Sequence, residues 1–276
     1  MPITEDRAAE STVMSTAVLV PAVPRPALRP LALPTEHGGW GFLFEPIVLA
    51  LAVAPSPAGA LIALSFILGF LTRQPLRLAL QDAVRGRAYP RTRWCWMFAA
   101  AYASGALVAL AAAVALRGWT VIIPLGLVAP LGLTQILYDA NNRSRSLLPE
   151  LAGATAMCSS AAAIAIAAGM RIVPAFVLAA IVVARAIPSI VYVRTLLTRS
   201  HGKTAPSWPA LALHALAILL IAVIAPKLAV VAMVLLFVRA AWGLSQPPPR
   251  AKKLGWTEIG VGLVVVLLAA TGYVLR

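Results

Sequence analysis

The stretch that decides the fold is RQPLRLALQDAVRGRAYPRTR, residues 73–93, which contains six arginines and a single acid. It follows the apolar run ALIALSFILGFL, residues 60–71. An apolar run that ends in clustered arginines is typical of a transmembrane helix whose end lies in the cytoplasm, because positive residues are retained on that side. The stretch therefore predicts a membrane protein, and it raises the question of which anions these arginines meet.

The composition of the whole chain also indicates a membrane protein. Hydrophobic residues make up 61% of the 276 residues and charged residues only 12%, so one soluble core cannot hide the apolar side chains. Membrane topology and anionic lipids explain the net charge of +14, and we predict no nucleic-acid binding. Cys95 and Cys158 lie in apolar runs without metal-ligand spacing, so we expect neither a disulfide framework nor a metal site.

Nine apolar runs are interpreted as transmembrane helices, since a crossing needs about twenty residues. With the N-terminus in the cytoplasm, seventeen Lys and Arg residues fall on that side, four fall outside, and two lie within spans. This bias predicts an all-α polytopic protein of the inner (plasma) membrane, with the C-terminus outside. The predicted spans are 40–54, 57–80, 94–116, 119–138, 147–169, 172–197, 208–225, 228–244 and 255–275.

The N-terminal residues 1–35 differ from the rest of the chain. They contain early acids, Ser and Thr, and then five prolines between positions 21 and 34. We predict a disordered cytoplasmic segment here, because it has too little apolar surface to bury. Residues 36–276 are predicted to form a single domain of nine transmembrane helices.

Arg185 is expected near the middle of the sixth span. A charge there needs a partner, because central placement in a bilayer costs about 2.5–3.5 kcal/mol on insertion scales. Ser189 and Tyr192 continue the same helical face, and Pro188 frees a backbone carbonyl. Two interpretations stay open, namely a structural ion pair between helices and a cation that faces a ligand in a polar cavity.

Three other charged residues fall within the predicted spans or near their ends: Glu45, Arg239 and Glu258. Pairing across helices, such as Glu45 with Arg185 or Glu258 with Arg239, would offset their desolvation. For Arg239 and Glu258 a structural role is the favoured interpretation, whereas Glu45 also remains a candidate for ligand binding.

Cationic and polar residues gather at the cytoplasmic end of the second span. Arg73, Arg77, Gln81 and Arg85 recur every four residues and therefore share one helical face. Like charges at this spacing repel one another unless an anion, a lipid headgroup or a glutamate lies between them. An arginine can grip phosphate or carboxylate oxygens with two hydrogen bonds. Other candidate ligand-binding residues on this side are His37, Asp82, Asp139, Asn142, Arg143 and Arg194.

Several motifs resemble the YwiC-like family of bacterial membrane proteins: EHGGWGFLFEP, TRQPLRLAL, DANNRSRSLLPELAGA and LGWTEIG. The layout is also similar, more distantly, to the UbiA superfamily of intramembrane prenyltransferases. That resemblance implies a UbiA-like bundle of nine helices with a cavity on the cytoplasmic side.

The aspartate-rich motifs of the UbiA superfamily are missing from this chain. In that superfamily the aspartates hold magnesium, which bridges them to an isoprenoid diphosphate. Here Arg73, Gln74 and Arg77 stand at the start of the first motif, and Pro188 and Ser189 stand in the second. Because no carboxylate cluster remains, we predict neither a metal nor the standard magnesium-dependent mechanism, and the cofactor stays unknown.

The resulting hypothesis is that arginines bind the anionic headgroup of a lipid or an isoprenoid phosphate directly. The lipid tail would lie between helices, with the headgroup at Arg73, Arg77, Arg143 and Arg194. If a reaction followed, His37, Asp82 and Asp139 would be the available acid–base groups. The alternatives are an anion or lipid transporter and a noncatalytic membrane scaffold. The sequence does not decide whether the protein is an enzyme.

Overall fold

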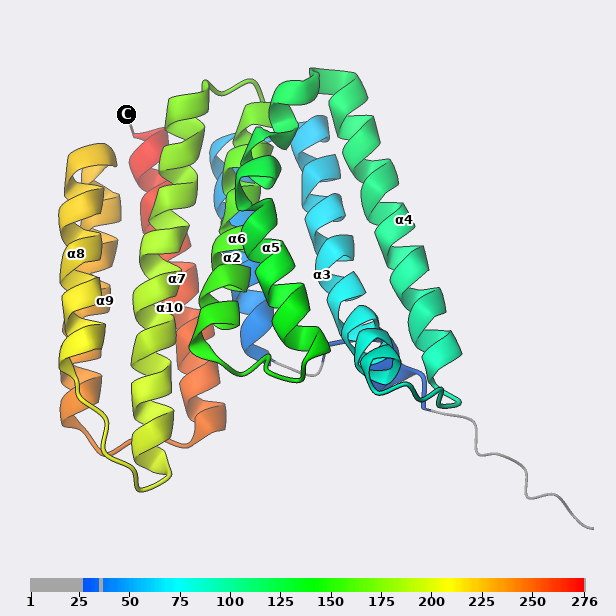
Figure 1. Cartoon of the computed structure of the whole chain (residues 1–276). Coiled ribbons are helices and arrows are strands. Elements are labelled where there is room, and N and C mark those ends of the chain that lie inside the picture. The colour runs from blue at the N-terminus through cyan, green and yellow to red at the C-terminus, as the bar shows by residue number, and fades with distance from the viewer. Residues whose placement is uncertain (1–26, 35–36, 276) are drawn as a thin grey trace, which may run out of the picture.

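The computed structural model describes residues 27–34 and 37–275. In this part of the chain there are nine long helices and no strands, which confirms the predicted all-α class (Figure 1). A short helix, α1 (Arg29–Ala32), precedes them, and a 3-10 turn, η1 (Trp119–Ile122), leads into the fifth. The long helices are α2 (His37–Val53), α3 (Pro57–Val84), α4 (Thr92–Arg117), α5 (Ile123–Ala140), α6 (Leu147–Ala167), α7 (Ile172–Ser200), α8 (Trp208–Ile224), α9 (Lys227–Ser245) and α10 (Ala251–Val274).

Most of these helices have the length and composition of membrane spans. Seven helices in the described residues are long and apolar enough to cross a bilayer. Helices α2 and α8 are apolar but shorter, at 17 residues each. The protein is therefore a multi-pass membrane protein, while nine crossings and the side on which each terminus lies remain predictions.

Proline and glycine set the helix boundaries. Pro57 begins α3 after Ser56, whose Oγ accepts a hydrogen bond of 2.9 Å from the Gly59 amide and so caps the helix. Gly118 has φ of 80° and ends α4 in a conformation that favours glycine. Pro188 lies inside α7, yet that helix runs unbroken from Ile172 to Ser200. Pro188 therefore does not break α7, and neighbouring helices can support the backbone around such a proline.

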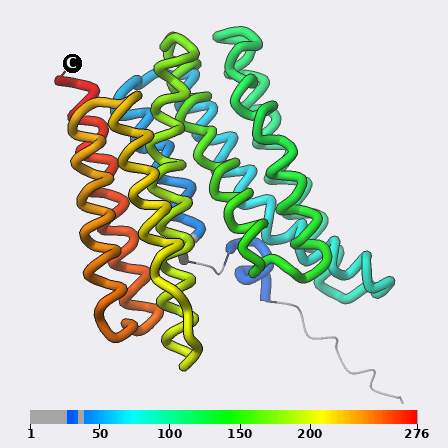
Figure 2. Tube along the Cα trace, turned by 60° about the vertical axis from the view of Figure 1, so that its left-hand side comes forward, coloured from blue at the N-terminus to red at the C-terminus, as the bar shows by residue number. Residues whose placement is uncertain are grey.

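Helices α6 and α7 form the centre of the bundle. Most residues of both are buried, and α6 packs against α2, α3, α5 and α7. The sequence of α6 is rich in Ala, Ser and Gly, and such small side chains let helix backbones approach closely within a membrane. Helices α4 and α5 are peripheral, since α4 packs along α3 and α5 packs mainly along α6 (Figures 1 and 2).

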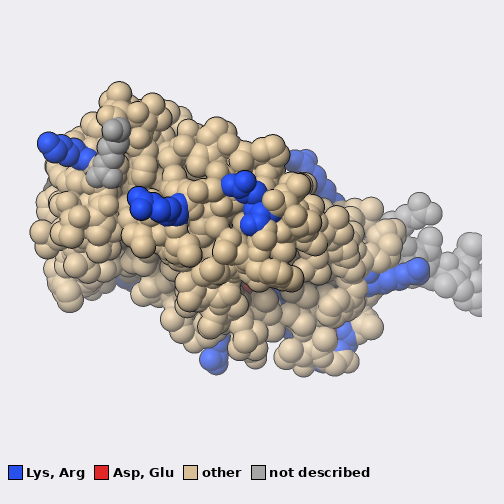
Figure 3. All heavy atoms as spheres, turned by 90° about the horizontal axis from the view of Figure 1, so that it is seen from above, with Lys and Arg blue, Asp and Glu red and all other residues tan. Residues whose placement is uncertain are grey.

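The two ends of the bundle differ in charge. The connections α3–α4, α5–α6, α7–α8 and α9–α10 lie at one end, together with most of the Lys and Arg residues, and we call this the basic face. The connections at the opposite end carry Arg117, Arg171 and Lys227 within the described residues. Figure 3 looks onto this opposite end and shows a few separate cationic side chains on a largely uncharged surface. This asymmetry is what the positive-inside rule expects if the basic face is cytoplasmic.

Part of the predicted disordered segment is helical. In α1, Leu31 is buried against Ala79 of α3 and Cys95 of α4. Residues 29–32 are therefore held against the basic face by apolar packing. Residues 1–26 and 35, which make up most of the predicted segment, lie outside the described residues.

Candidate functional site

A cavity of about 790 Å³ opens within the bundle near the basic face, and we call it the central cavity. Helices α2, α6, α7 and α10 supply most of its wall, with single side chains from α3 and α5. Arg73 and Arg194, which the sequence places on separate helix ends, both line it. Its charged lining residues are Glu45, Arg73, Arg145, Glu150, Arg185, Arg194, Lys203 and Glu258.

The deep end of the central cavity borders a cluster of four charges, three of which line it. Arg185 is only 2% exposed, and its Nε lies 2.8 Å from Glu45 Oε2. Its Nη2 donates a hydrogen bond of 2.9 Å to the backbone oxygen of Glu258. Arg239 forms an ion pair with the Glu258 carboxylate. Both pairings named as examples from the sequence are therefore present, and two positive charges balance two negative ones.

Aromatic rings and a glycine complete this four-charge cluster. Arg185 lies over the Phe42 ring at 5.7 Å, and Arg239 lies over the Tyr192 ring at 4.1 Å, both suited to cation–π attraction. Tyr192 thus contacts Arg239 and does not line the central cavity. A Cβ atom at Gly262 would collide with the Glu45 carboxylate and lie 3.0 Å from Arg185 Nη2. The missing side chain of Gly262 makes room for the ion pair.

Ser189 is an additional polar group of the cavity wall. It follows Arg185 by one helical turn in α7 and is 1% exposed. Its Oγ has no hydrogen-bond partner among the described residues. A buried hydroxyl without a partner is uncommon, which makes this a position where a bound polar group would be stabilised.

The mouth of the central cavity, at the basic face, has a different charge balance. Arg194 pairs with Glu150 at 2.8 Å and donates a second hydrogen bond of 3.0 Å to the backbone oxygen of Arg145. Both side chains of this pair are more than a third exposed. No carboxylate of the described residues pairs with Arg145 or Lys203. The mouth is therefore net cationic, whereas the deep end is neutral.

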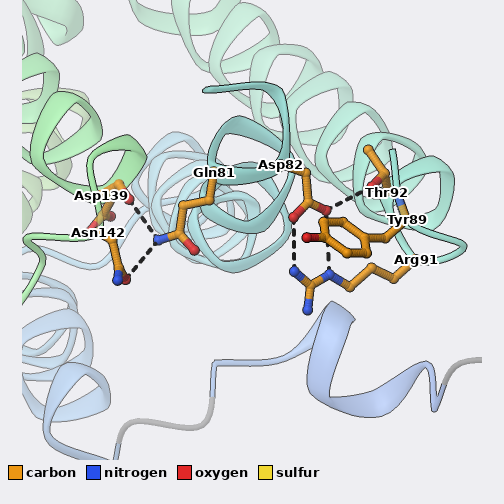
Figure 4. A network of polar contacts seen from close by, with 7 residues as sticks. All are labelled: Gln81, Asp82, Tyr89, Arg91, Thr92, Asp139 and Asn142. Atoms are coloured by element: carbon orange, nitrogen blue, oxygen red, sulfur yellow. Dashed lines mark hydrogen bonds and ion pairs between the residues drawn. The ribbon is translucent and has the colours of Figure 1, made fainter. Parts of the chain in front are cut away.

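Arg73 lies against a carboxylate of the protein itself. Its Nε and Nη2 donate to the two Asp139 oxygens at 2.8 and 3.2 Å, in a bidentate pair. Gln81 binds the end of the same helix, since its Nε2 donates to the Asp139 backbone oxygen at 2.8 Å (Figure 4). The anion expected beside this row of arginines thus includes Asp139, a residue of α5.

A second cavity, of about 380 Å³, lies between α3, α4, α5 and α6. Its wall is mainly apolar, and its polar end contains Arg73, Arg77 and Asp139. Four residues line both cavities: Arg73, Gln135, Gly153 and Met157. The two cavities therefore meet at the side of α6 that faces α3 and α5.

Asp82 points away from both cavities. It accepts hydrogen bonds from Arg91 Nη2 at 2.9 Å and from the Thr92 hydroxyl at 2.7 Å, so it holds the start of α4 (Figure 4). Its hydrogen bonds to Arg91 raise the pKa of that guanidinium above its usual value. Gln81 and Asp82 are neighbours in sequence, yet they point to opposite sides of α3.

The remaining predicted residues fall outside the two cavity walls or outside the described side chains. Asn142 and Arg143 are exposed in the α5–α6 connection, and neither lines a cavity. His37 begins α2, but its side chain lies outside what the structure describes. Within the described residues there is no group of three or more His, Cys, Asp or Glu side chains that could hold a metal ion.

The lining residues that were not among the predicted site residues include Gln135, Arg145 and Lys203. Arg145 lies next to the predicted Arg143 in the NRSRS segment, and the sequence offers no reason to prefer one over the other. Lys203 follows Gly202, whose φ of 74° helps turn the chain after α7. Gln135 stands in an apolar span, where a lone amide was a signal that could have been noticed.

Comparison with known proteins agrees with the sequence resemblance. Residues 33–165 match the family model described as YwiC-like protein. No curated protein and no solved structure matches the chain. The matched part runs from the segment before α2 to near the end of α6, and it includes Glu45, Arg73, Asp139 and Gly153. Over residues 33–165, slightly less than half of its length, the chain is therefore similar to the YwiC-like family.

Proposed function

We propose that this membrane protein binds an anionic lipid or an isoprenoid phosphate, with the anionic group at the mouth of the central cavity. The observation that carries the proposal is the gradient of charge along this cavity, from a neutral deep end to a net cationic mouth. An anion is attracted most strongly where positive charge is not already balanced, so the mouth is the favoured position for it.

The mouth offers suitable donors for a phosphate. Arg145, Arg194 and Lys203 line it, and guanidinium and ammonium groups donate charge-assisted hydrogen bonds to phosphate oxygens. Arg73 and Arg185 are less suitable, because each already contacts a carboxylate. We therefore propose that the headgroup contacts Arg145, Arg194 and Lys203. The sequence-based hypothesis gives Arg73, Arg77, Arg143 and Arg194 as its contacts.

The one-sided opening favours binding from the basic face over transport. Beyond the four-charge cluster, the bundle is filled by fully buried residues such as Ala161, Leu178 and Ile181. A transporter would need a second state that opens toward the opposite face. A scaffold would not need a cavity of this size at all. The proposal is for binding, because no described residue of the cavity wall is a nucleophile hydrogen-bonded to a base.

The test is a binding assay on purified protein in phosphatidylcholine nanodiscs. Radiolabelled phosphatidic acid and farnesyl phosphate serve as two separate probes, which distinguishes a glycerolipid from an isoprenoid. We expect the double variant R145Q/K203Q to bind at least one probe about tenfold more weakly, since each hydrogen bond to a charged group is worth about 1.5–3 kcal/mol before compensation by neighbours.

The matched control is R171Q/K227Q, which removes two exposed charges from the opposite end of the bundle. It lowers the net charge by the same amount, so it reports any nonspecific attraction to anionic lipid. We expect it to bind both probes as the wild type does. Equal binding of both probes by the wild type and R145Q/K203Q would overturn the proposal.

A further inference from the structure

The second cavity is open toward the bilayer on one side. Gly69, Ala129 and Ile136 line it and are also exposed on the outside of the bundle. Helix α4 packs along α3, and α5 packs mainly along α6. Helix α4 also contacts η1, which leads into α5. On the basic-face side of η1, the second cavity lies between these two helices, with Ala106 of α4 and Val128 of α5 in its wall, and we call this cavity the chain groove.

The surroundings of the chain groove restrict what can occupy it. Its wall is apolar over most of its length, with side chains such as Phe66, Leu76 and Val128. The hydrocarbon core of a bilayer contains almost no water, so an apolar groove that opens into it is filled by hydrocarbon chains. The polar end, with the Arg73–Asp139 pair, lies toward the basic face.

The chain groove is continuous with the central cavity. At their junction, a Cβ atom on Gly153 would collide with the Gln135 side-chain amide, so the absence of that atom lets Gln135 lie against α6. Gln135, Gly153, Met157 and Arg73 belong to both walls. A molecule with a polar part in one cavity and an apolar part in the other would pass over these four residues.

We infer that the chain groove holds one hydrocarbon chain of the anionic amphiphile, which enters sideways between α4 and α5 and reaches the central cavity past Gln135 and Gly153. This inference rests on the proposed function, because it assigns the apolar part of the same ligand. It also explains why an ion pair and an amide lie at the inner end of an apolar groove, where the polar part of the amphiphile begins.

Two glycines of α5 provide a matched pair of variants. Gly132 lines the chain groove and Gly126 does not, and a Cβ atom at either position would meet nothing within 4 Å. Phenylalanine at Gly132 fills the groove, whereas phenylalanine at Gly126 points into open space on the same helix. The probes are lysophosphatidic acids with an oleoyl or a hexanoyl chain, measured in phosphatidylcholine nanodiscs.

We expect G132F to weaken binding of the oleoyl probe about tenfold and to leave the hexanoyl probe unchanged. G126F should change neither. Unchanged oleoyl binding by G132F, together with loss of both probes in R145Q/K203Q, would overturn the inference and leave the proposed function standing. Loss of both probes in G132F would also overturn it, because the groove would then not be selective for the chain. Failure of the proposed function itself appears as unchanged binding in R145Q/K203Q.

A second measurement does not depend on a variant that folds. An oleoyl probe with a diazirine at the end of its chain is photocrosslinked to the wild-type protein, and the labelled peptides are identified by mass spectrometry. We expect labels within residues 57–167, which include the groove helices α3 to α6, and competition by unlabelled probe. Labels confined to residues 208–245, the outer helices α8 and α9, would contradict the inference.

Discussion

The arginines at the two ends of the central cavity differ in their carboxylate partners. At the deep end, Arg185 and Arg239 both contact carboxylates, and all four side chains of the cluster are at most 16% exposed. At the mouth, Arg194 shares Glu150 in a pair that is more than a third exposed, and Arg145 has no carboxylate partner among the described residues. Where water is excluded the protein supplies its own counter-charge, and where water enters it leaves positive charge available.

This difference has an energetic consequence for each end. Removing one partner from a buried pair leaves an uncompensated charge in a low-dielectric environment, which is strongly destabilising. Removing one partner from an exposed pair costs little, because water and salt screen the charge that remains. The same kind of mutation should therefore separate the two ends by its effect on stability.

The largest effect is expected for E45Q at the deep end. The substitution keeps the shape of the side chain but removes the charge that lies 2.8 Å from Arg185 Nε. We expect a loss of about 3–5 kcal/mol in the free energy of unfolding, as for other broken buried pairs. The measurement is thermal unfolding of purified protein in detergent, followed by tryptophan fluorescence and size-exclusion chromatography.

The double variant E45M/R185M is the control for this prediction. It removes both charges and fills the space with apolar side chains, so it should recover much of the stability lost in E45Q. If E45Q unfolds at the temperature of the wild type, the pair is not essential to the bundle, and a ligand-facing role for Arg185 becomes the better interpretation.

An intermediate effect is expected for G262A. The added methyl group collides with the Glu45 carboxylate beside Arg185, so the ion pair must shift within a packed bundle. Overpacking of this kind costs about 1–3 kcal/mol. On the same helix, G260A adds a methyl group that meets nothing within 4 Å, and it should leave the unfolding temperature unchanged or slightly higher. Equal unfolding temperatures for the two variants would show that the four-charge cluster is not tightly packed.

The sequence predicted the helices well because their signal is local. Each predicted span overlaps one long helix, since an apolar run of about twenty residues and its flanking charges are visible without knowledge of any neighbour. The pairs Glu45–Arg185 and Glu258–Arg239 could also be anticipated, because a buried charge requires an opposite one. Pro188, by contrast, lies within a continuous α7, so a proline alone does not predict a helix end in this bundle.

The candidate site was harder to predict because it depends on which way each side chain points. Asp82 and Gln81 are adjacent in sequence. Asp82 accepts a hydrogen bond at the start of α4, whereas Gln81 donates one to the end of α5. Arg143 and Arg145 are two positions apart, and only Arg145 lines the central cavity. A glycine such as Gly153 has no chemical signal of its own. Its importance comes from Gln135 on a neighbouring helix, and this contact is set by helix packing.

The smallest effect on stability is expected for E150Q at the mouth. Glu150 and Arg194 are 36% and 38% exposed, so losing this pair should cost less than about 1 kcal/mol. Binding should change in the opposite direction. Without this carboxylate the mouth has one more unbalanced positive charge, and we expect phosphatidic acid to bind E150Q about twofold more tightly at low salt, with the gain lost at high salt. Measurements of phosphatidic acid binding to the protein in nanodiscs, at two salt concentrations, test this prediction. Weaker binding by E150Q would mean that Glu150 is needed to hold Arg194 in position, so that the mouth, like the deep end, depends on charge pairs within the protein.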